Sequence, residues 1–280
     1  MAIRGLYTDE VKKLGGRGVT GLRHAGDNMR VGAVSYLNTR PLIHRFSDFA
    51  PDTELVLDVP SRLADRLQRG ELDVALIPSV EALRVPRYKI VSDACIACHG
   101  PVLSVKLLSR VPMSRIRTLA LDEGSRTSVA LVQILLSERL GVRPRLQTLS
   151  LGDANWETSV DTDAVLVIGD RAIHASQLVY SDQWDLGEQW WQWTGLPFVF
   201  AMWMARPDVN THSVARALAK SRDAGVAELD VIAESAAQEV GLDAAVCLSY
   251  LRDNLHFSLG TMEQEGLLQF HQYAVRFGCV

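Results

Sequence analysis

Four consecutive polar residues, Ser125-Arg126-Thr127-Ser128, stand between an acidic turn at 122–124 and a strongly amphipathic stretch. Ser125 is a typical N-cap residue, so the sequence predicts that a long helix begins here and ends at Gly141. The first-turn amides and the Thr127 and Ser128 hydroxyls can hold a carboxylate or a phosphate, and Arg126 can add a positive charge. A capping motif without any ligand explains the same residues equally well.

Polar residues also follow several predicted strands, at the positions where open α/β sheets bind ligands. Asn38 comes after the first strand and offers both a hydrogen-bond donor and an acceptor. Ser79 and Ser104 supply hydroxyls, and Glu81 and Asp170 supply carboxylates for acid–base chemistry. Turn formation, helix capping and surface ion pairs are the competing explanations for these residues.

Two short motifs match cofactor patterns without the context that those patterns need. Residues 16–21 fit G-x-G-x-x-G, but no strand precedes and no helix follows them, which favours a Gly-rich extension. The run from Cys95 to His99 fits the C-x-x-C-H haem pattern, but it lies in a predicted buried strand and no signal peptide is visible. Cys247 and Cys279 lack the spacing of a zinc site. We therefore expect small buried cysteines, with His99 at a strand end near the presumed cleft.

These residues lie among short apolar strands that alternate with helices from Met29 onward. Such alternation predicts an α/β fold with largely parallel sheets. The order of the elements predicts two lobes that are joined by two crossings and enclose a ligand cleft. We expect a flexible N-terminal extension at 1–28, a first lobe at 29–110, a second lobe at 111–201, and a C-terminal part of the first lobe, with its helices, at 202–280.

Composition excludes several classes of protein. The 280 residues carry a formal net charge of −4, which argues against a nucleic-acid-binding protein. No apolar run is long enough for a membrane span, and 4 cysteines do not make a disulfide scaffold. We expect a cytoplasmic protein with a small-molecule partner, no nucleic acid and no membrane; the oligomeric state stays open.

Six segments, taken together and in order, resemble one family, the chorismate dehydratases of the futalosine route to menaquinone. The segments are 31–42 (VGAVSYLNTRPL), 72–81 (LDVALIPSVE), 100–105 (GPVLSV), 125–131 (SRTSVAL), 168–172 (IGDRA) and 193–201 (WTGLPFVFA). The resemblance is dense from Met29 to about Arg206 and looser in the C-terminal helices. The family more usually has small or basic residues where Cys98 and His99 stand here.

The resemblance implies an α/β, two-lobed fold like that of type 2 periplasmic binding proteins, with the ligand cleft between the lobes. It implies dehydration of chorismate to 3-[(1-carboxyvinyl)oxy]benzoate by a hydro-lyase that needs no metal and no organic cofactor. It implies catalytic roles for Asn38 and Ser104. The substrate contacts that follow from it are Ser79, Ser125, Arg126, Thr127, Ser128, Gly169 and Asp170.

Several alternatives stay open at the level of sequence. The catalytic base is Glu81, Asp170, His99 or a carboxylate of the substrate itself. A sister enzyme of the same route, 1,4-dihydroxy-6-naphthoate synthase, would use a clear histidine base, for which His99 and His174 are the candidates. A carboxylate-binding module without catalysis is the other alternative.

Overall fold

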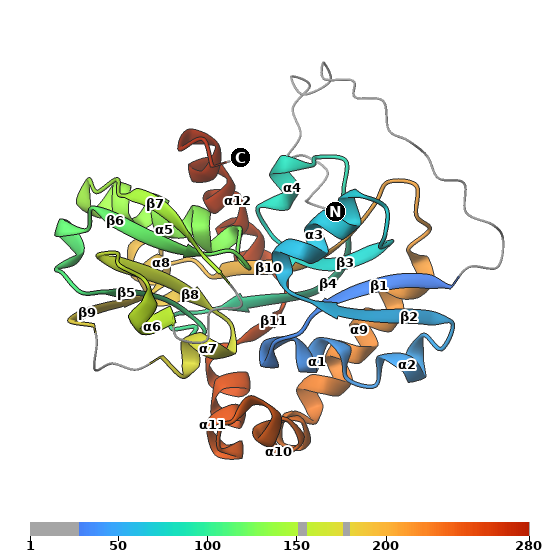
Figure 1. The fold of residues 1–280 in the computed structure, drawn as a ribbon. Helices are drawn as coiled ribbons and strands as arrows, with labels where there is room; N and C mark the ends of the chain where they lie inside the picture. Colours follow the sequence, from blue (N-terminus) through green and yellow to red (C-terminus); the bar gives the residue numbers. More distant parts are fainter. Residues whose placement is uncertain (1–27, 151–155, 176–179, 280) are drawn as a thin grey trace.

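The alternating strands and helices build two β-sheets, each covered by helices (Figure 1). The computed structural model describes residues 28–150, 156–175 and 180–279. The predicted extension at 1–28, and the G-x-G-x-x-G match inside it, therefore lie outside the described residues except for Asn28. Within those ranges, every helix is too short or too polar to cross a lipid bilayer.

The first sheet has the strand order β11-β4-β10-β3-β1-β2. Its two innermost strands, β3 and β10, are buried along their whole length, as expected for strands that are covered on both faces. The strands of this sheet are β1 (Met29–Val34), β2 (Thr53–Asp58), β3 (Val74–Pro78), β4 (Lys89–Cys98), β10 (Phe198–Ala205) and β11 (His256–Ser258).

The second sheet has the strand order β7-β6-β8-β5-β9. Its central strand β8 is an unbroken apolar run and is fully buried. The strands of this sheet are β5 (Val105–Ser109), β6 (Thr118–Asp122), β7 (Arg145–Leu149), β8 (Ala164–Ile168) and β9 (Asp182–Asp185).

Both sheets are mixed, which corrects the prediction of largely parallel sheets. Parallel pairing is found between β1 and both β2 and β3, and between β6 and both β7 and β8. In contrast, β10 runs antiparallel to β3 and β4, and β5 runs antiparallel to β8 and β9. Parallel neighbours need a crossover helix over their own sheet. The chain instead enters β5 and β10 directly from the other lobe, so these strands run against their neighbours.

Helices cover both sheets, and α5 lies where the sequence predicts a long helix. The helices of the first lobe are α1 (Arg40–Ile43), α2 (Phe46–Phe49), α3 (Pro60–Gln68), α4 (Glu81–Arg84), α9 (His212–Ala227), α10 (Leu229–Val240), α11 (Ala244–Ser249) and α12 (Thr261–Arg276). Those of the second lobe are α5 (Thr127–Leu140), α6 (Trp156–Ser159), α7 (Asp170–Ile173) and α8 (Leu186–Thr194).

The chain crosses between the sheets twice, at 99–104 and at 195–197. Strand β5 thus belongs to the second sheet and β10 to the first, so both crossings lie several residues before the predicted limits at 110 and 201. Helix α12 returns to the junction and packs against both β10 and α5 (Figure 1). One large cluster of buried apolar residues continues from one sheet to the other through this junction.

Candidate active site

A pocket lies between the two sheets, at the carboxyl ends of β1, β3 and β8. Residues from both lobes line it, as a cleft between lobes requires. The lining residues are Val34, Tyr36, Asn38, Pro60, Pro78, Ile96, Val102, Ser104, Val105, Ser125, Thr127, Ser128, Ile168, Gly169, Phe200 and Ala201.

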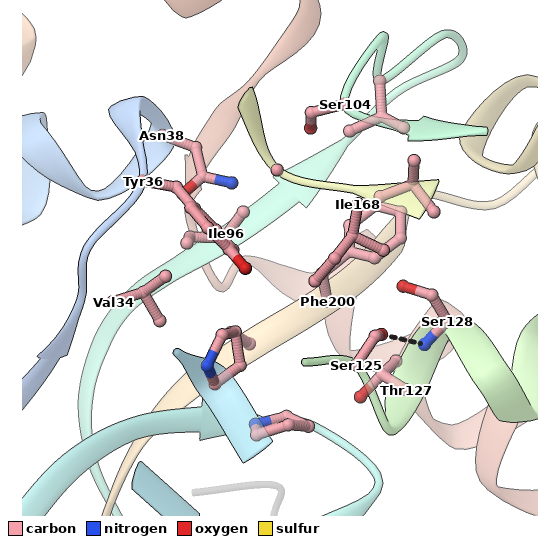
Figure 2. Close-up of a pocket in the computed structure, with 16 residues that line it drawn as sticks. Val34, Tyr36, Asn38, Ile96, Ser104, Ser125, Thr127, Ser128, Ile168 and Phe200 are labelled. Atoms are coloured by element: carbon pink, nitrogen blue, oxygen red, sulfur yellow. Dashed lines mark hydrogen bonds between the residues drawn. The ribbon is translucent and has the colours of Figure 1, made fainter. Parts of the chain in front are cut away.

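The first turn of α5 forms one side of this pocket (Figure 2). The Ser125 hydroxyl accepts a hydrogen bond from the Ser128 N–H at 3.1 Å, so Ser125 caps the helix although the first helical residue is Thr127. The Thr127 hydroxyl in turn accepts from the Val80 N–H of the first lobe at 3.3 Å. The helix start therefore presents hydroxyls and backbone amides together with the positive end of the helix dipole, an arrangement suited to a carboxylate.

Asn38 and Ser104 form the other polar side of the pocket, with Ile168 and Phe200 between them and α5 (Figure 2). Asn38 lies in a tight helical turn after β1, and its side-chain oxygen accepts from the Thr39 hydroxyl at 3.2 Å. Ser104 is almost completely buried and lies next to β8, because its carbonyl accepts from the Gly169 N–H at 2.9 Å. An amide and a hydroxyl thus face a helix start across an apolar space.

Sequence reasoning missed two tyrosines: Tyr36, which lines the pocket, and Tyr250, which lies beside two of the lining residues. Tyr36 lines the pocket, and burial raises the pKa of its phenol well above the usual range. The Tyr250 hydroxyl is fully buried beside the Ser104 and Asn38 side chains, and burial raises its pKa as well. Tyr250 lies in a single π-helical turn, a distortion that is frequent at functional sites. The one sequence signal for Tyr36 was its position two residues before Asn38, a predicted site residue.

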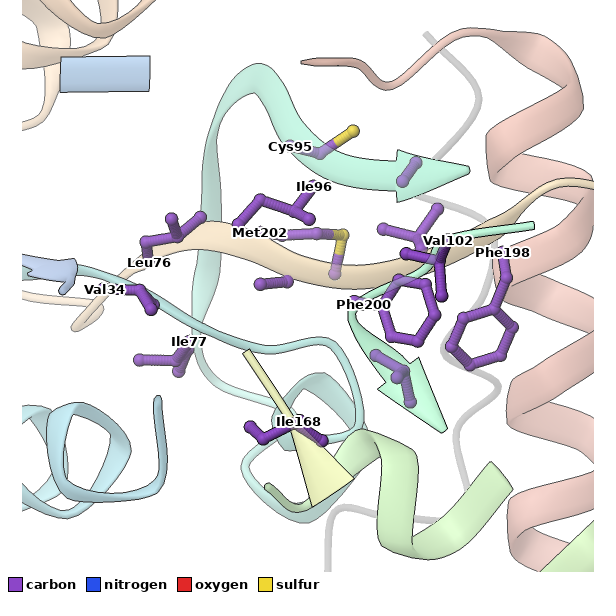
Figure 3. Packing of buried hydrophobic residues seen from close by; sticks show 14 of the residues in the cluster. Val34, Leu76, Ile77, Cys95, Ile96, Val102, Ile168, Phe198, Phe200 and Met202 are labelled. Carbon is purple, nitrogen blue, oxygen red and sulfur yellow. The ribbon is translucent and has the colours of Figure 1, made fainter. Parts of the chain in front are cut away.

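The apolar walls of the pocket are continuous with the core (Figure 3). Val34, Ile96, Ile168 and Phe200 belong both to the pocket lining and to the large buried cluster. Neighbouring side chains pack them from behind, which fixes the shape of the pocket. A flat, partly apolar ring fits between such walls and leaves its polar substituents to the two polar sides.

Two charged residues predicted to contact substrate, Arg126 and Asp170, do not line the pocket. The Arg126 guanidinium donates to Glu81 at 3.1 Å and to Asp65 at 2.5 Å, both in the first lobe. The Asp170 carboxylate accepts from the Leu37 N–H at 3.1 Å, also across the cleft. In this structure both side chains therefore connect the two lobes beside the pocket.

Ser79 and the predicted protein bases also lie outside the lining. The Ser79 hydroxyl is completely buried, donates to the Val199 carbonyl at 2.7 Å and lies 3.4 Å from the Thr127 hydroxyl. Glu81 pairs with Arg126 and Arg84, and His99 pairs with Glu263. The described residues that line the pocket include no carboxylate, imidazole, guanidinium or ammonium group.

A buried ion pair supports the strand ends next to the pocket. The Asp122 carboxylate is completely buried, accepts from the Ile168 and Gly124 N–H groups, and pairs with Arg171. Burial raises the pKa of Asp122, and the Arg171 guanidinium opposes that rise. The pair fixes β6 against β8 and so holds the start of α5 and Gly169 in place. Its contacts join residues 46 to 49 positions apart, which no local pattern reveals.

The two cysteines of the C-x-x-C-H run are free and fully buried in β4. Burial raises the pKa of both thiols far above neutral pH, so they stay protonated. They fill the core as small apolar groups, in agreement with the expectation from sequence. His99 stands at the end of β4, outside the pocket lining.

Comparison with known proteins adds a family to this geometry. A family model described as menaquinone biosynthesis matches residues 29–276. A curated chorismate dehydratase of Thermus thermophilus is 30% identical over 260 residues, which cover 86% of this chain and 93% of the relative. A chorismate dehydratase of Campylobacter jejuni is 28% identical over 179 residues, which cover 62% of this chain and 66% of the relative.

Solved structures share the fold at low sequence identity. A crystal structure of a protein from Archaeoglobus fulgidus has a TM-score of 0.74 at 16% identity and covers 92% of this chain and 100% of its own. The periplasmic aliphatic sulphonate binding protein of Escherichia coli has a TM-score of 0.59 at 14% identity, with 91% and 88% covered. The fold is therefore α/β and two-lobed, as in periplasmic binding proteins.

Proposed function

Because this chain belongs to the menaquinone-biosynthesis family, we propose that it is a hydro-lyase that removes water from chorismate to give 3-[(1-carboxyvinyl)oxy]benzoate. The observation that carries the proposal is the match to a curated chorismate dehydratase over 86% of the chain, on a pocket whose polar groups suit carboxylates. The proposal includes a cytoplasmic location, which is the usual compartment of biosynthetic enzymes.

The shape and chemistry of the pocket support this substrate. Chorismate is a cyclohexadiene ring with one carboxylate on the ring, a second on an enol-ether side chain, and one hydroxyl. In the proposed complex the ring lies between the apolar walls at Ile168 and Phe200. The start of α5, with Ser125 and Ser128, binds the ring carboxylate, and Asn38 and Ser104 face the hydroxyl that leaves.

The reaction makes an aromatic ring, so the protein mainly has to orient the substrate and stabilise developing charge. Loss of the C3 proton gives an electron-rich intermediate whose charge spreads toward the ring carboxylate. Donors at the helix start bind that carboxylate more strongly as its charge grows, which favours the transition state over the ground state. Expulsion of the C4 hydroxyl then completes the elimination.

We propose that the side-chain carboxylate of the substrate is the base. The described pocket lining offers no carboxylate or imidazole, and Glu81, Asp170 and His99 are engaged elsewhere. The enol-ether carboxylate is attached through oxygen to the carbon that loses the proton, so it reaches that proton within one molecule. The proton then passes to the leaving hydroxyl, and water is released without any net redox change.

The alternatives from sequence receive less support. The sister synthase was expected to use His99 or His174 as its base. Neither imidazole lines the pocket, and His174 bonds to the Val240 carbonyl. The likeness to a periplasmic binding protein is a likeness of fold alone, at 14% identity.

The direct test is to incubate the purified chain with chorismate and follow the aromatic product by ultraviolet absorbance and mass spectrometry. We expect enzyme-dependent formation of a product lighter than chorismate by one water. Binding of chorismate without turnover would support the non-catalytic module instead, and the absence of both would contradict the proposal.

Asn38→Ala tests the proposed catalytic side. The substitution removes the amide that faces the leaving hydroxyl, so kcat should fall by about 100-fold while the chain stays folded. The matched control is Asn254→Ala, which removes an exposed amide that bonds to the Pro101 carbonyl outside the pocket. Near-normal kcat in Asn38→Ala would contradict the role proposed for Asn38.

A further inference from the structure

Three side chains that are far apart in the sequence converge at one end of the first sheet. His99 follows β4, His256 begins β11 and Glu263 lies in the first turn of α12. The His99 Nε2 lies 2.5 Å from the Glu263 Oε1, and the His256 Nε2 lies 3.6 Å from the same oxygen. One nitrogen or oxygen of each side chain lies within 4.8 Å of those of the other two.

This cluster is separate from the pocket, because none of its three residues lines that space. The Glu263 side chain is only 4% exposed, whereas the imidazoles of His99 and His256 are 39% and 43% exposed. A buried carboxylate needs positive charge beside it. Both ion-pair partners of Glu263 within the described part of the chain are imidazoles, whose ring nitrogens can also bind a metal ion.

The surrounding structure holds the three side chains in position. The His99 ring stacks on Trp191 of the second lobe, with ring centres 5.9 Å apart and an angle of 8° between the planes. The His256 ring lies 4.6 Å from that of His99, and β11 pairs with β4 through His256 and Ala97. The donor atoms are therefore largely preorganised, with their open side toward solvent.

Two imidazoles and one carboxylate form a donor set that divalent transition metals prefer, and it occurs in zinc sites. Around a tetrahedral zinc ion, ligand atoms about 2.0–2.1 Å from the metal lie about 3.3 Å from one another. The separations in the cluster lie on both sides of that value, so small rotations of the two half-exposed imidazoles are sufficient. Solvent can fill the remaining coordination position.

We propose that His99, His256 and Glu263 bind one divalent transition-metal ion of the zinc class. The ion fastens the end of β4 to β11 and to the start of α12, directly before the crossing at 99–104 that leads to Ser104. It is a structural site outside the pocket and takes no part in the proposed dehydration. The other two ligands, His256 and Glu263, lie 157 and 164 residues after His99. This separation is too long for a sequence motif, so the sequence alone did not connect them with His99.

The test is a calorimetric titration of Zn²⁺ into tag-free, metal-stripped full-length protein, with bound zinc measured after dialysis. We expect one ion per chain, and a melting temperature that rises with Zn²⁺. His99→Gln and His256→Gln should each weaken binding roughly tenfold or more and abolish that rise. His99→Gln changes a half-exposed residue and is therefore the variant least prone to disturb folding.

The matched control is His44→Gln, because His44 forms a comparable pair with Glu228 at 2.9 Å without a second imidazole in the cluster. This variant should bind Zn²⁺ like the unmodified protein. Absence of stoichiometric binding, or undiminished binding in both His99→Gln and His256→Gln, would overturn the proposal. Because the readout is metal content and melting temperature, the result does not depend on the chorismate assay.

Discussion

At the scale of single residues, Gly169 is held in a conformation that only glycine adopts readily. Its φ of 68° and ψ of −157° lie in a region closed to side chains, and a Cβ there would lie 2.8 Å from the Tyr36 ring. The backbone at the end of β8 therefore contacts the phenol directly, so this position determines both the strand end and the placement of Tyr36 in the pocket.

Gly169→Ala should lower the free energy of unfolding by about 1–3 kcal/mol and raise KM, because Tyr36 must move into the pocket. Gly141→Ala is the matched control, since Gly141 also has a φ of 68° but has no atom within 4 Å of its Cβ position. The control should lose about 1 kcal/mol and keep its KM. Denaturant unfolding and steady-state kinetics measure the two effects; an unchanged KM in Gly169→Ala would contradict the argument.

His271 should make the free energy of unfolding depend on pH. It lies on α12, its Nε2 is 3.4 Å from the Ser79 carbonyl, and burial lowers its pKa to about 4. The unfolded chain has the ordinary value near 6.5 and binds the proton more readily. Stability should therefore fall as pH decreases from about 6.5 to 4, by at most about 3 kcal/mol. Urea unfolding of His271→Gln at both pH values should show a smaller decrease, and an equal decrease would argue against His271.

At the scale of elements, the start of α5 is anchored to the first lobe by the ion pairs of Arg126. This side chain reaches Asp65 in α3 and Glu81 in α4, and the Glu81 carboxylate is 4% exposed. The Arg126 guanidinium therefore holds the helix start against the opposite wall of the cleft and does not bind the substrate. The neighbouring hydroxyls of Ser125 and Ser128 line the pocket.

Arg126→Met should lower the free energy of unfolding by about 2 kcal/mol, because among the described residues it leaves the buried Glu81 with only the Arg84 pair at 3.4 Å. Arg126→Met combined with Glu81→Gln should recover part of that loss. Arg62→Met, which removes an exposed pair with Asp58, should cost less than about 0.5 kcal/mol. A KM that rises about 100-fold with unchanged stability would instead show that Arg126 binds the substrate.

Most elements could be predicted from sequence because their patterns are strong. The apolar run of β8 and helix α5, which ends at Gly141, are examples. The prediction that α5 is amphipathic is wrong, because residues on most sides of the helix are buried between other elements. The segment 40–49 forms two short helices, α1 and α2, because Arg45 between them adopts a φ of 54°. Strands β9 and β11 were missed, since runs of four and three residues are too short to show a period.

The site was predictable only in part, for a physical reason. Asn38, Ser104 and the 125–128 turn follow strands, and strand ends meet at one edge of a sheet, so their convergence could be inferred. Where a long charged side chain points depends on partners elsewhere in the chain. Arg126 meets Asp65 and Glu81, which are 61 and 45 positions away, and Tyr250 arrives from the C-terminal helices.

At the scale of the whole molecule, the two lobes are joined by more than the two crossings. Helix α12 packs against both lobes, the Ser61 N–H donates to the Gly124 carbonyl, and Asp170 receives the Leu37 N–H. The polar lining residues Ser104, Ser125, Thr127 and Ser128 are at most 8% exposed. The polar groups on the two sides of the pocket therefore act in a medium of low dielectric constant, where hydrogen bonds to a carboxylate are strongest.

The uncharged lining has a consequence for how substrate arrives. A basic cleft draws anions from a distance, and that attraction weakens as salt is added. Here the chain carries a net charge of −4, and the described lining offers amides and hydroxyls that act only at contact. Added salt should therefore leave kcat/KM for the doubly charged substrate unchanged or slightly higher, as measured from about 20 to 200 mM NaCl. A steep decrease would reveal electrostatic steering; its absence would mean that encounter is governed by diffusion and recognition begins inside the cleft.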